Sequence, residues 1–178
     1  AACHPNQHHE QVALIEGVGA KTVPEQRSRM TAARISCPTC HQQKDVSATG
    51  TMVWKASLNS CLSCHEPEDS QRLESYHVVL KAALADVEAN LKTIGEAVKT
   101  AELPADRAAA MATQLENLQH DLAFLRVGNG VHNIHYADTL TRALVDQLTA
   151  LCRELQVDAP TITLPEPAEP KPAAADAS

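Results

Sequence analysis

The sequence predicts a mainly α-helical protein, in which an irregular N-terminal region is followed by an antiparallel helical hairpin or three-helix bundle. The bundle is predicted by residues 67–156, which are rich in Ala, Leu, Glu, Lys and Gln and carry apolar residues at helical spacing. The irregular region is predicted by residues 1–66, which contain Gly, Pro, Ser and Thr and show no sustained apolar period. We expect loops and short helical turns in this region, and no core made from its own side chains.

The first predicted helix has the clearest pattern. Its apolar stripe steps alternately by four and three residues, as expected of the seam along which two helices pack. The stripe consists of Leu73, His77, Leu80, Leu84, Val87, Leu91, Ile94 and Val98. His77 is its one polar member.

Two further helices are predicted after short breaks. Pro104 suits the first turn of the second helix because its φ angle is fixed, and a Gly128-Asn129-Gly130 break separates this helix from a third over residues 131–155. The apolar stripes are Met111, Leu115, Leu118, Leu122 and Leu125 in the second helix, and Ala137, Leu144, Leu148, Leu151 and Leu155 in the third. Breaks this short imply antiparallel neighbours. His120 falls off the stripe, so we expect it to be exposed, and we expect Cys152 to be a small buried thiol.

Composition limits the remaining possibilities. Residues 157–178 contain five prolines, which predicts an extended or disordered tail or a linker. Fifteen Lys and Arg against 22 Asp and Glu give a formal charge of −7, which argues against a nucleic-acid-binding surface. No apolar run approaches the roughly 20 residues that span a bilayer, so we expect no transmembrane segment.

The cysteines carry the strongest chemical signal. Residues 37–41 and 61–65 are two copies of Cys-x-x-Cys-His, and residues 1–4 end in a partial copy, Cys3-His4. A c-type haem needs two thiols that reach its vinyl groups and an adjacent imidazole that binds the iron. The motifs therefore predict three haem c groups. The attachment residues are Cys3, Cys37, Cys40, Cys61 and Cys64, and the proximal ligands are His4, His41 and His65.

A zinc-binding structural module is the minor alternative. The four cysteines of the two complete motifs also fit C-x₂-C-x₂₀-C-x₂-C, which is close to the spacing of a zinc ribbon. Zinc does not explain why a histidine follows both pairs, or why Cys3 is followed by His4. Structural disulfides would likewise need a separate explanation for both histidines.

The chain resembles the multihaem c-type cytochromes with paired CXXCH motifs. The resemblance lies in residues 1–4, 37–41 and 61–65, in residues 30–36 before the second motif, and in Gly130-Val131-His132-Asn133, which is similar to a Gly-x-His-Asn element in pentahaem nitrite reductases and their relatives. It implies a bacterial or archaeal protein of the periplasm or the outer face of the cell envelope, with haems close enough to exchange electrons. Its partners would be other redox proteins or further haem domains. The first motif lacks its first cysteine, so we expect the sequence to begin inside a larger protein.

Six histidines remain for the distal positions, so bis-histidine ligation is expected. The candidates are His8, His9, His77, His132 and His135. His8 and His9 are too near His4 to cap the same haem, so they would serve a neighbour. His132 follows two glycines that allow a sharp turn, and His135 is its rival on the same face. His77 would be costly to bury among aliphatic residues unless a metal or a hydrogen bond holds it.

Two classes of function follow from these ligands. The first is an electron-transfer protein that passes electrons between bis-histidine haems, in bacterial anaerobic or extracellular respiration. The second is an oxidoreductase in which one haem keeps an open position and reduces a small nitrogen or sulfur species. The surplus of histidines favours the first class.

Overall fold

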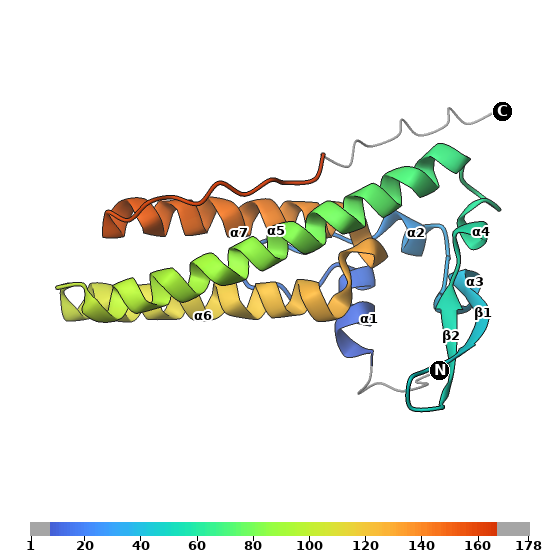
Figure 1. The fold of residues 1–178 in the computed structure, drawn as a ribbon, viewed down its shortest axis with the longest axis horizontal. Helices are drawn as coiled ribbons and strands as arrows, with labels where there is room; N and C mark the ends of the chain where they lie inside the picture. Colours follow the sequence, from blue (N-terminus) through green and yellow to red (C-terminus); the bar gives the residue numbers. More distant parts are fainter. Residues whose placement is uncertain (1–7, 167–178) are drawn as a thin grey trace.

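Three long helices form the body of the molecule. The computed structural model describes residues 8–166, and in it α5 (Pro67–Thr100), α6 (Ala105–Gly128) and α7 (Ile134–Leu155) form one bundle, with α6 antiparallel to both α5 and α7 (Figure 1). A short 3₁₀ helix, η1 (Gly130–Asn133), joins α6 to α7. The fold is therefore mainly α, as the sequence predicts, and the helical part is a three-helix bundle.

The core of the bundle is built from the predicted stripes. The stripe residues that are buried are Leu80, Leu84, Val87, Leu91 and Ile94 on α5, Met111, Leu115, Leu118, Leu122 and Leu125 on α6, and Ala137, Leu144, Leu148 and Leu151 on α7. Leu155 is half-buried, and the core also contains residues outside the predicted stripes, such as Leu140, Phe124 and Tyr136. Leu73, His77 and Val98, at the two ends of the first stripe, are half-buried. Cys152 is buried and His120 is exposed, as expected.

The ends of the helices follow local rules. Pro67 is the first residue of α5, where its missing N–H costs nothing, and Glu68 and Asp69 place negative charge in the first turn. Gly130 is required by packing, because a Cβ atom there would lie 2.4 Å from Cδ2 of Leu80 and 3.0 Å from Cβ of Ala137. The turn before α7 can therefore lie directly against α5.

The N-terminal region contains short helices and one β-hairpin. The helices are α1 (His9–Glu16), α2 (Arg29–Ala32), α3 (Cys37–Cys40) and α4 (Leu58–Cys61), and the strands are β1 (His41–Val46) and β2 (Met52–Ala56). The expectation of loops and helical turns alone is wrong for residues 41–56. The strands pair antiparallel, with Lys44 opposite Trp54 and Val46 opposite Met52. The polar sequence of β1 has no apolar alternation, so pattern analysis gives no strand signal there.

Helix α1 packs on the bundle and not on the hairpin. Leu14 is fully buried and joins the same apolar core as the three long helices. The approach to α6 is close, because a Cβ atom at Gly128 would lie 3.0 Å from the carbonyl oxygen of Glu10. The described part of the chain thus has one core, to which α1 contributes.

The segment after α7 returns along the bundle. Residues 157–166 have neither helix nor strand, Pro165 is buried, and the Arg142 guanidinium donates a hydrogen bond of 2.8 Å to the Pro165 carbonyl oxygen (Figure 1). The rest of the predicted tail lies outside the described residues. Among the helices of residues 8–166, none combines the length and apolar character needed to cross a membrane.

Candidate functional site

The β-hairpin brings the two complete CXXCH motifs side by side. Helix α3 leads directly into β1, and β2 is followed by α4, so antiparallel pairing places both motifs at the same end of the hairpin (Figure 1). The hydroxyl of Ser60 in α4 donates a hydrogen bond of 2.9 Å to the carbonyl oxygen of Cys40 in α3. Motifs that are about twenty residues apart in the sequence therefore form one cluster.

The thiols of this cluster are free and partly accessible. Cys37 and Cys64 are exposed, Cys40 and Cys61 are half-buried, and none forms a disulfide. Burial raises the pKa of the Cys40 thiol, and the neighbouring thiols of Cys61, Cys37 and Cys64 raise it further. Across residues 8–166, no three or more His, Cys, Asp or Glu side chains are grouped to hold a metal ion.

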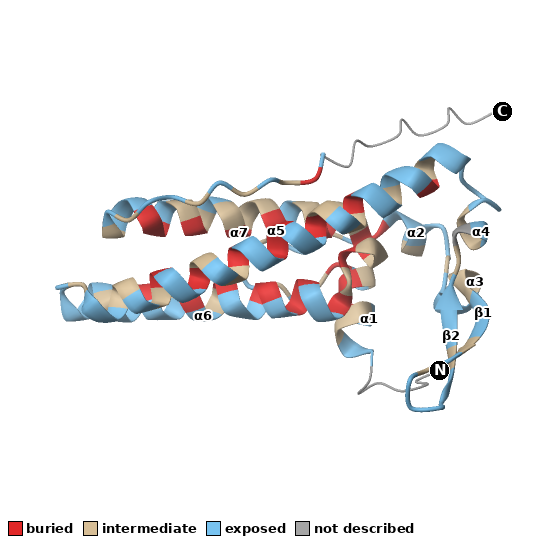
Figure 2. Ribbon diagram, viewed as in Figure 1, coloured by how far each residue is buried: buried red, intermediate tan, exposed pale blue. Residues whose placement is uncertain are grey.

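The segment that carries the motifs has no buried core. Between Ser28 and Ser70, both buried, every residue whose burial is described is exposed or half-buried (Figure 2). Large apolar side chains are exposed there, and Trp54 has 53% of its surface accessible. The others with substantial exposure are Met30, Val46, Met52 and Leu62. These apolar side chains are accessible to a bound group or a partner.

Two of the histidines predicted as iron ligands lie beside each other. His41 follows Cys40 at the end of α3, and His132 lies in η1 at the end of the bundle. Their ring centroids are 6.3 Å apart and their ring planes differ by 6°. Both rings are half-buried, and each Nδ1 is hydrogen-bonded to backbone carbonyl oxygen.

The other predicted ligands are more separate. His65 is exposed, and its Nδ1 lies 3.4 Å from the Asp69 carboxylate one turn later. His8 and His9 are exposed at the start of α1, and His135 is half-buried in the first turn of α7. Cys3 and His4 lie outside the described residues.

His77 is less buried than its place in the apolar stripe predicts. The residue is half-buried near the start of the seam, so it is not an imidazole enclosed by aliphatic side chains. Its neighbours in the sequence fix its position, because the Tyr76 hydroxyl donates to the Ile134 carbonyl oxygen and Leu80 packs against Gly130. His77 therefore lies at the end of the bundle that bears η1, and its role as a ligand stays a prediction.

A loop before the motifs is anchored by residues that the sequence interpretation missed. Asp121 of α6 is fully buried and accepts hydrogen bonds from the amides of Lys21 and Thr22, at 2.8 and 2.9 Å, and from the Thr22 hydroxyl. The amide of Ala20 donates to the Tyr136 hydroxyl at 3.2 Å. These contacts fix residues 20–22, which lead towards α2 and the first complete motif.

Asn133 is the second anchor. Its Nδ2 donates to the carbonyl oxygens of Leu14, at 3.0 Å, and Gln26, at 2.8 Å, while its Oδ1 accepts the Tyr136 amide at 3.2 Å and caps α7. The sequence predicts the third helix from residue 131, whereas α7 begins at Ile134, so pattern analysis misses the N-cap role of Asn133. Its two long-range hydrogen bonds also have no sequence signal. One side chain thus ties α1, the loop before α2 and the start of α7 together.

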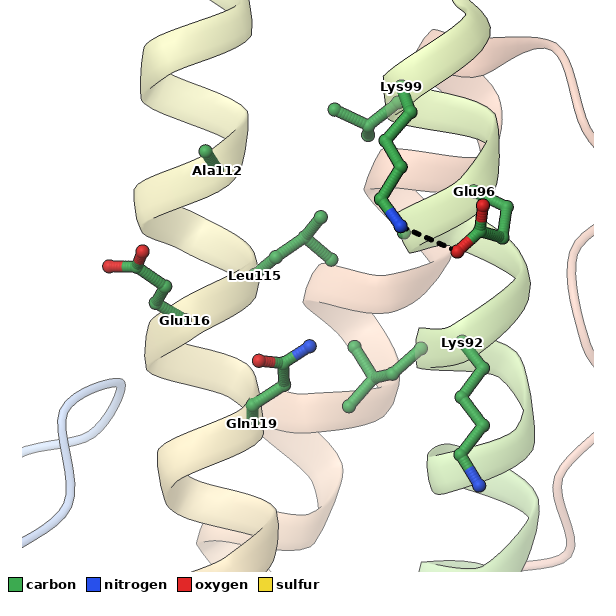
Figure 3. A pocket seen from close by; sticks show the side chains of 10 residues that line it. Lys92, Glu96, Lys99, Ala112, Leu115, Glu116 and Gln119 are labelled. Carbon is green, nitrogen blue, oxygen red and sulfur yellow. Dashed lines mark hydrogen bonds and ion pairs between the residues drawn. The ribbon is translucent and has the colours of Figure 1, made fainter.

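A groove lies elsewhere on the bundle. It has a volume of about 560 Å³ and lies between the C-terminal part of α5 and the middle of α6, with Leu115 at its base and the Glu96–Lys99 ion pair of 2.7 Å at its rim (Figure 3). Its charged side chains are solvent-exposed, and no cysteine or histidine lines it. The cysteines and histidines of the two complete motifs lie at the opposite end of the bundle (Figure 1).

Comparisons of the chain with models of protein families, with curated proteins and with solved structures gave no match.

Proposed function

We propose that this chain is an electron-transfer part of a multihaem c-type cytochrome. The observation that carries the proposal is the segment over residues 29–69. It contains both complete CXXCH motifs, none of its described side chains is buried, and it holds a cluster of accessible thiols. Two covalently bound porphyrins would cover the exposed apolar side chains of this segment, and burial of that area stabilises by about 25 cal/mol per Å².

The residues present fit such a group. Each motif offers two unpaired thiols, followed directly by an imidazole, and the exposed Cys37 and Cys64 leave room for a large ligand. The iron of a bound haem takes only two ligands from the protein, and the cysteines bind the porphyrin and not the iron. A site of this kind therefore needs no cluster of three or more side chains that ligate one metal ion. When bound, haem supplies a one-electron centre whose potential depends on its axial ligands and its surroundings.

The protein contributes attachment, spacing and anchoring. Cys37 and Cys40 would hold one group and Cys61 and Cys64 the next, with His41 and His65 as proximal ligands. The hairpin fixes the two motifs beside each other, and the Ser60–Cys40 hydrogen bond holds this spacing. Cys3 and His4 would belong to a third group. Two adjacent redox centres in one chain suit transfer of electrons to other redox proteins or further haem domains, in the periplasm or on the outer face of the cell envelope.

The test is the intact mass of the chain, expressed in a host that matures c-type cytochromes, together with its reduced absorption spectrum. We expect covalent addition of one haem for each complete motif and a c-type spectrum. The double variant Cys37→Ala/Cys40→Ala should lose one haem and become protease-sensitive within residues 29–66. Cys152→Ala, which removes a buried thiol outside any motif, is the matched control and should keep every haem. A soluble wild-type chain without haem, or with bound zinc in its place, would overturn the proposal.

Carbon monoxide separates electron transfer from the alternative of a haem oxidoreductase. A chain whose haems are all six-coordinate should keep its ferrous spectrum when carbon monoxide is added. A shifted spectrum would reveal an open position, at which a small nitrogen or sulfur species could be reduced.

A further inference from the structure

Two imidazoles from distant parts of the chain lie beside each other. His41 is positioned by α3 and the hairpin, whereas His132 is positioned by η1 and the bundle. Their ring planes are nearly parallel, at 6°, and their centroids are 6.3 Å apart. No hydrogen bond joins the two rings, and Nδ1 of each is used by a different backbone carbonyl. Their approach is thus set by two separate scaffolds.

The hydrogen bonds define which nitrogen is available on each ring. Nδ1–H of His41 donates to the Trp54 carbonyl oxygen at 2.9 Å. Nδ1–H of His132 donates to the carbonyl oxygens of Gly128, at 2.8 Å, and Asn129, at 3.0 Å. A neutral imidazole that carries its proton on Nδ1 has a lone pair on Nε2, and a backbone carbonyl in this role is typical of metal-bound histidines. Both rings are therefore prepared to bind a metal through Nε2.

The separation of the rings matches a metal ion between them. Metal–nitrogen bonds to histidine are about 2 Å long and the ring centre lies about 1.1 Å behind the bonding nitrogen, so two imidazoles on opposite sides of one ion have centres roughly 6 Å apart. The measured 6.3 Å agrees with this arrangement. Offset stacking of two rings allows the same centroid separation, and the free Nε2 atoms are what distinguish a shared metal ion from a simple stack.

We propose that His41 and His132 are the two axial ligands of a single haem, the one attached through Cys37 and Cys40. The inference rests on the proposed function and adds to it the assignment of one distal ligand to one motif. The bundle would then anchor the motif segment, because an axial bond to His132 would connect this segment, which has no buried core, to the packed helices.

The surroundings of both rings are suited to hold this geometry. Gly130 packs on Leu80 without room for a methyl group, and Asn133 fixes the other side of His132 through three hydrogen bonds. His41 is held by strand pairing, since the carbonyl that accepts its proton belongs to the neighbouring strand. Ligands held by packing and hydrogen bonds in this way lose little freedom on binding.

The experiment measures spin state in the haem-loaded full chain by absorption and electron paramagnetic resonance. Haem attachment is first verified by mass, so absence of haem counts against the proposed function and not against the pairing. His132→Ala should convert one low-spin haem to high-spin, and added imidazole should restore it. His120→Ala, an exposed histidine on α6, is the matched control and should change no haem.

A second pair of variants tests whether the haem that His132 binds is the one attached through Cys37 and Cys40. With Cys61→Ala/Cys64→Ala in the background, the haem on Cys37 and Cys40 should still become high-spin on His132→Ala. With Cys37→Ala/Cys40→Ala in the background, His132→Ala should leave the remaining haem unchanged. If His132→Ala does not fold, His132→Met should keep six-coordination and raise the midpoint potential of the same haem. A low-spin haem on Cys37 and Cys40 in the His132→Ala variant, or an unchanged potential in His132→Met, would overturn the pairing.

Discussion

The side chain of Asn133 provides the sharpest test of how the N-terminal segment is attached to the bundle. It is 2% exposed and makes three hydrogen bonds, two as a donor to the carbonyls of Leu14 and Gln26 and one as the N-cap acceptor of α7. At about 1 kcal/mol for each bond, Asn133→Ala should lower the free energy of unfolding by about 3 kcal/mol. With a urea slope of about 2 kcal/mol per molar, the unfolding midpoint should fall by about 1.5 M.

Asn133→Asp separates the two roles of this residue. Aspartate is an equally good N-cap and would still accept the Tyr136 amide, but its second oxygen would lie against the carbonyl oxygens of Leu14 and Gln26. We therefore expect Asn133→Asp to be at least as destabilising as Asn133→Ala at pH 7. Because the folded state would favour the neutral carboxyl, this destabilisation should grow as the pH rises through about 4.

The assay is urea unfolding of the haem-loaded chain, followed by far-ultraviolet circular dichroism, with trypsin cleavage after the exposed Arg27 as a local readout. Asn90→Ala is the matched control, because it removes an exposed hydrogen bond of 2.8 Å to Asp86 and should change stability by less than about 0.5 kcal/mol. If Asn133→Asp unfolds at the wild-type midpoint at pH 7, the residue acts only as an N-cap and the reasoning on its two donors is refuted.

Three further substitutions test the bundle and its end. Gly130→Ala should destabilise by about 1 to 3 kcal/mol in thermal unfolding because its Cβ would clash with Leu80, whereas Gly95→Ala, which meets no atom within 4 Å, should stabilise by up to about 1 kcal/mol; equal effects would contradict the close approach at Gly130. Burial raises the pKa of Tyr76, so the unfolded state loses its phenol proton first, above pH of about 10, and stability should fall as the pH rises further. Tyr76→Phe should flatten this fall in stability at alkaline pH, and an unaltered slope would refute the prediction. His77→Met should raise one haem midpoint potential in redox titration, and unchanged potentials would show that His77 only packs.

The bundle could be predicted from the sequence because its buried apolar residues recur at helical spacing. Leu84, Leu118 and Leu148 each stand on a stripe of helical period, and each is buried where three helices meet. The breaks are equally informative, since Pro104 directly precedes α6, where its fixed φ is suitable, and Gly130 lies where a Cβ atom would clash with Leu80. The fold class follows from such local signals.

The hairpin and the anchored loop could not be predicted in the same way. Strand β1 is polar and is held by backbone pairing, which depends on β2 and not on its own sequence. Asp121 is a carboxylate within a helix that accepts three hydrogen bonds from residues about 100 positions earlier, besides its contact with the neighbouring His120 ring, and no local rule distinguishes it from an exposed acid. The CXXCH spacing predicts the cysteines as site residues, whereas only the tertiary structure brings His41 close to His132.

The two halves of the molecule are therefore stabilised by different forces, and this difference bears on the function. The bundle buries large aliphatic side chains of its own, whereas residues 29–69 bury none of the side chains whose placement is described. The loop that joins them is fixed by polar anchors on the bundle, Asp121, Tyr136 and Asn133. Since Asn133 is adjacent to His132, the anchor and the proposed distal ligand share one turn. A rigid bundle that holds both the entrance to the motif segment and an imidazole beside it would keep a bound redox centre in place while leaving the motif segment open to partners.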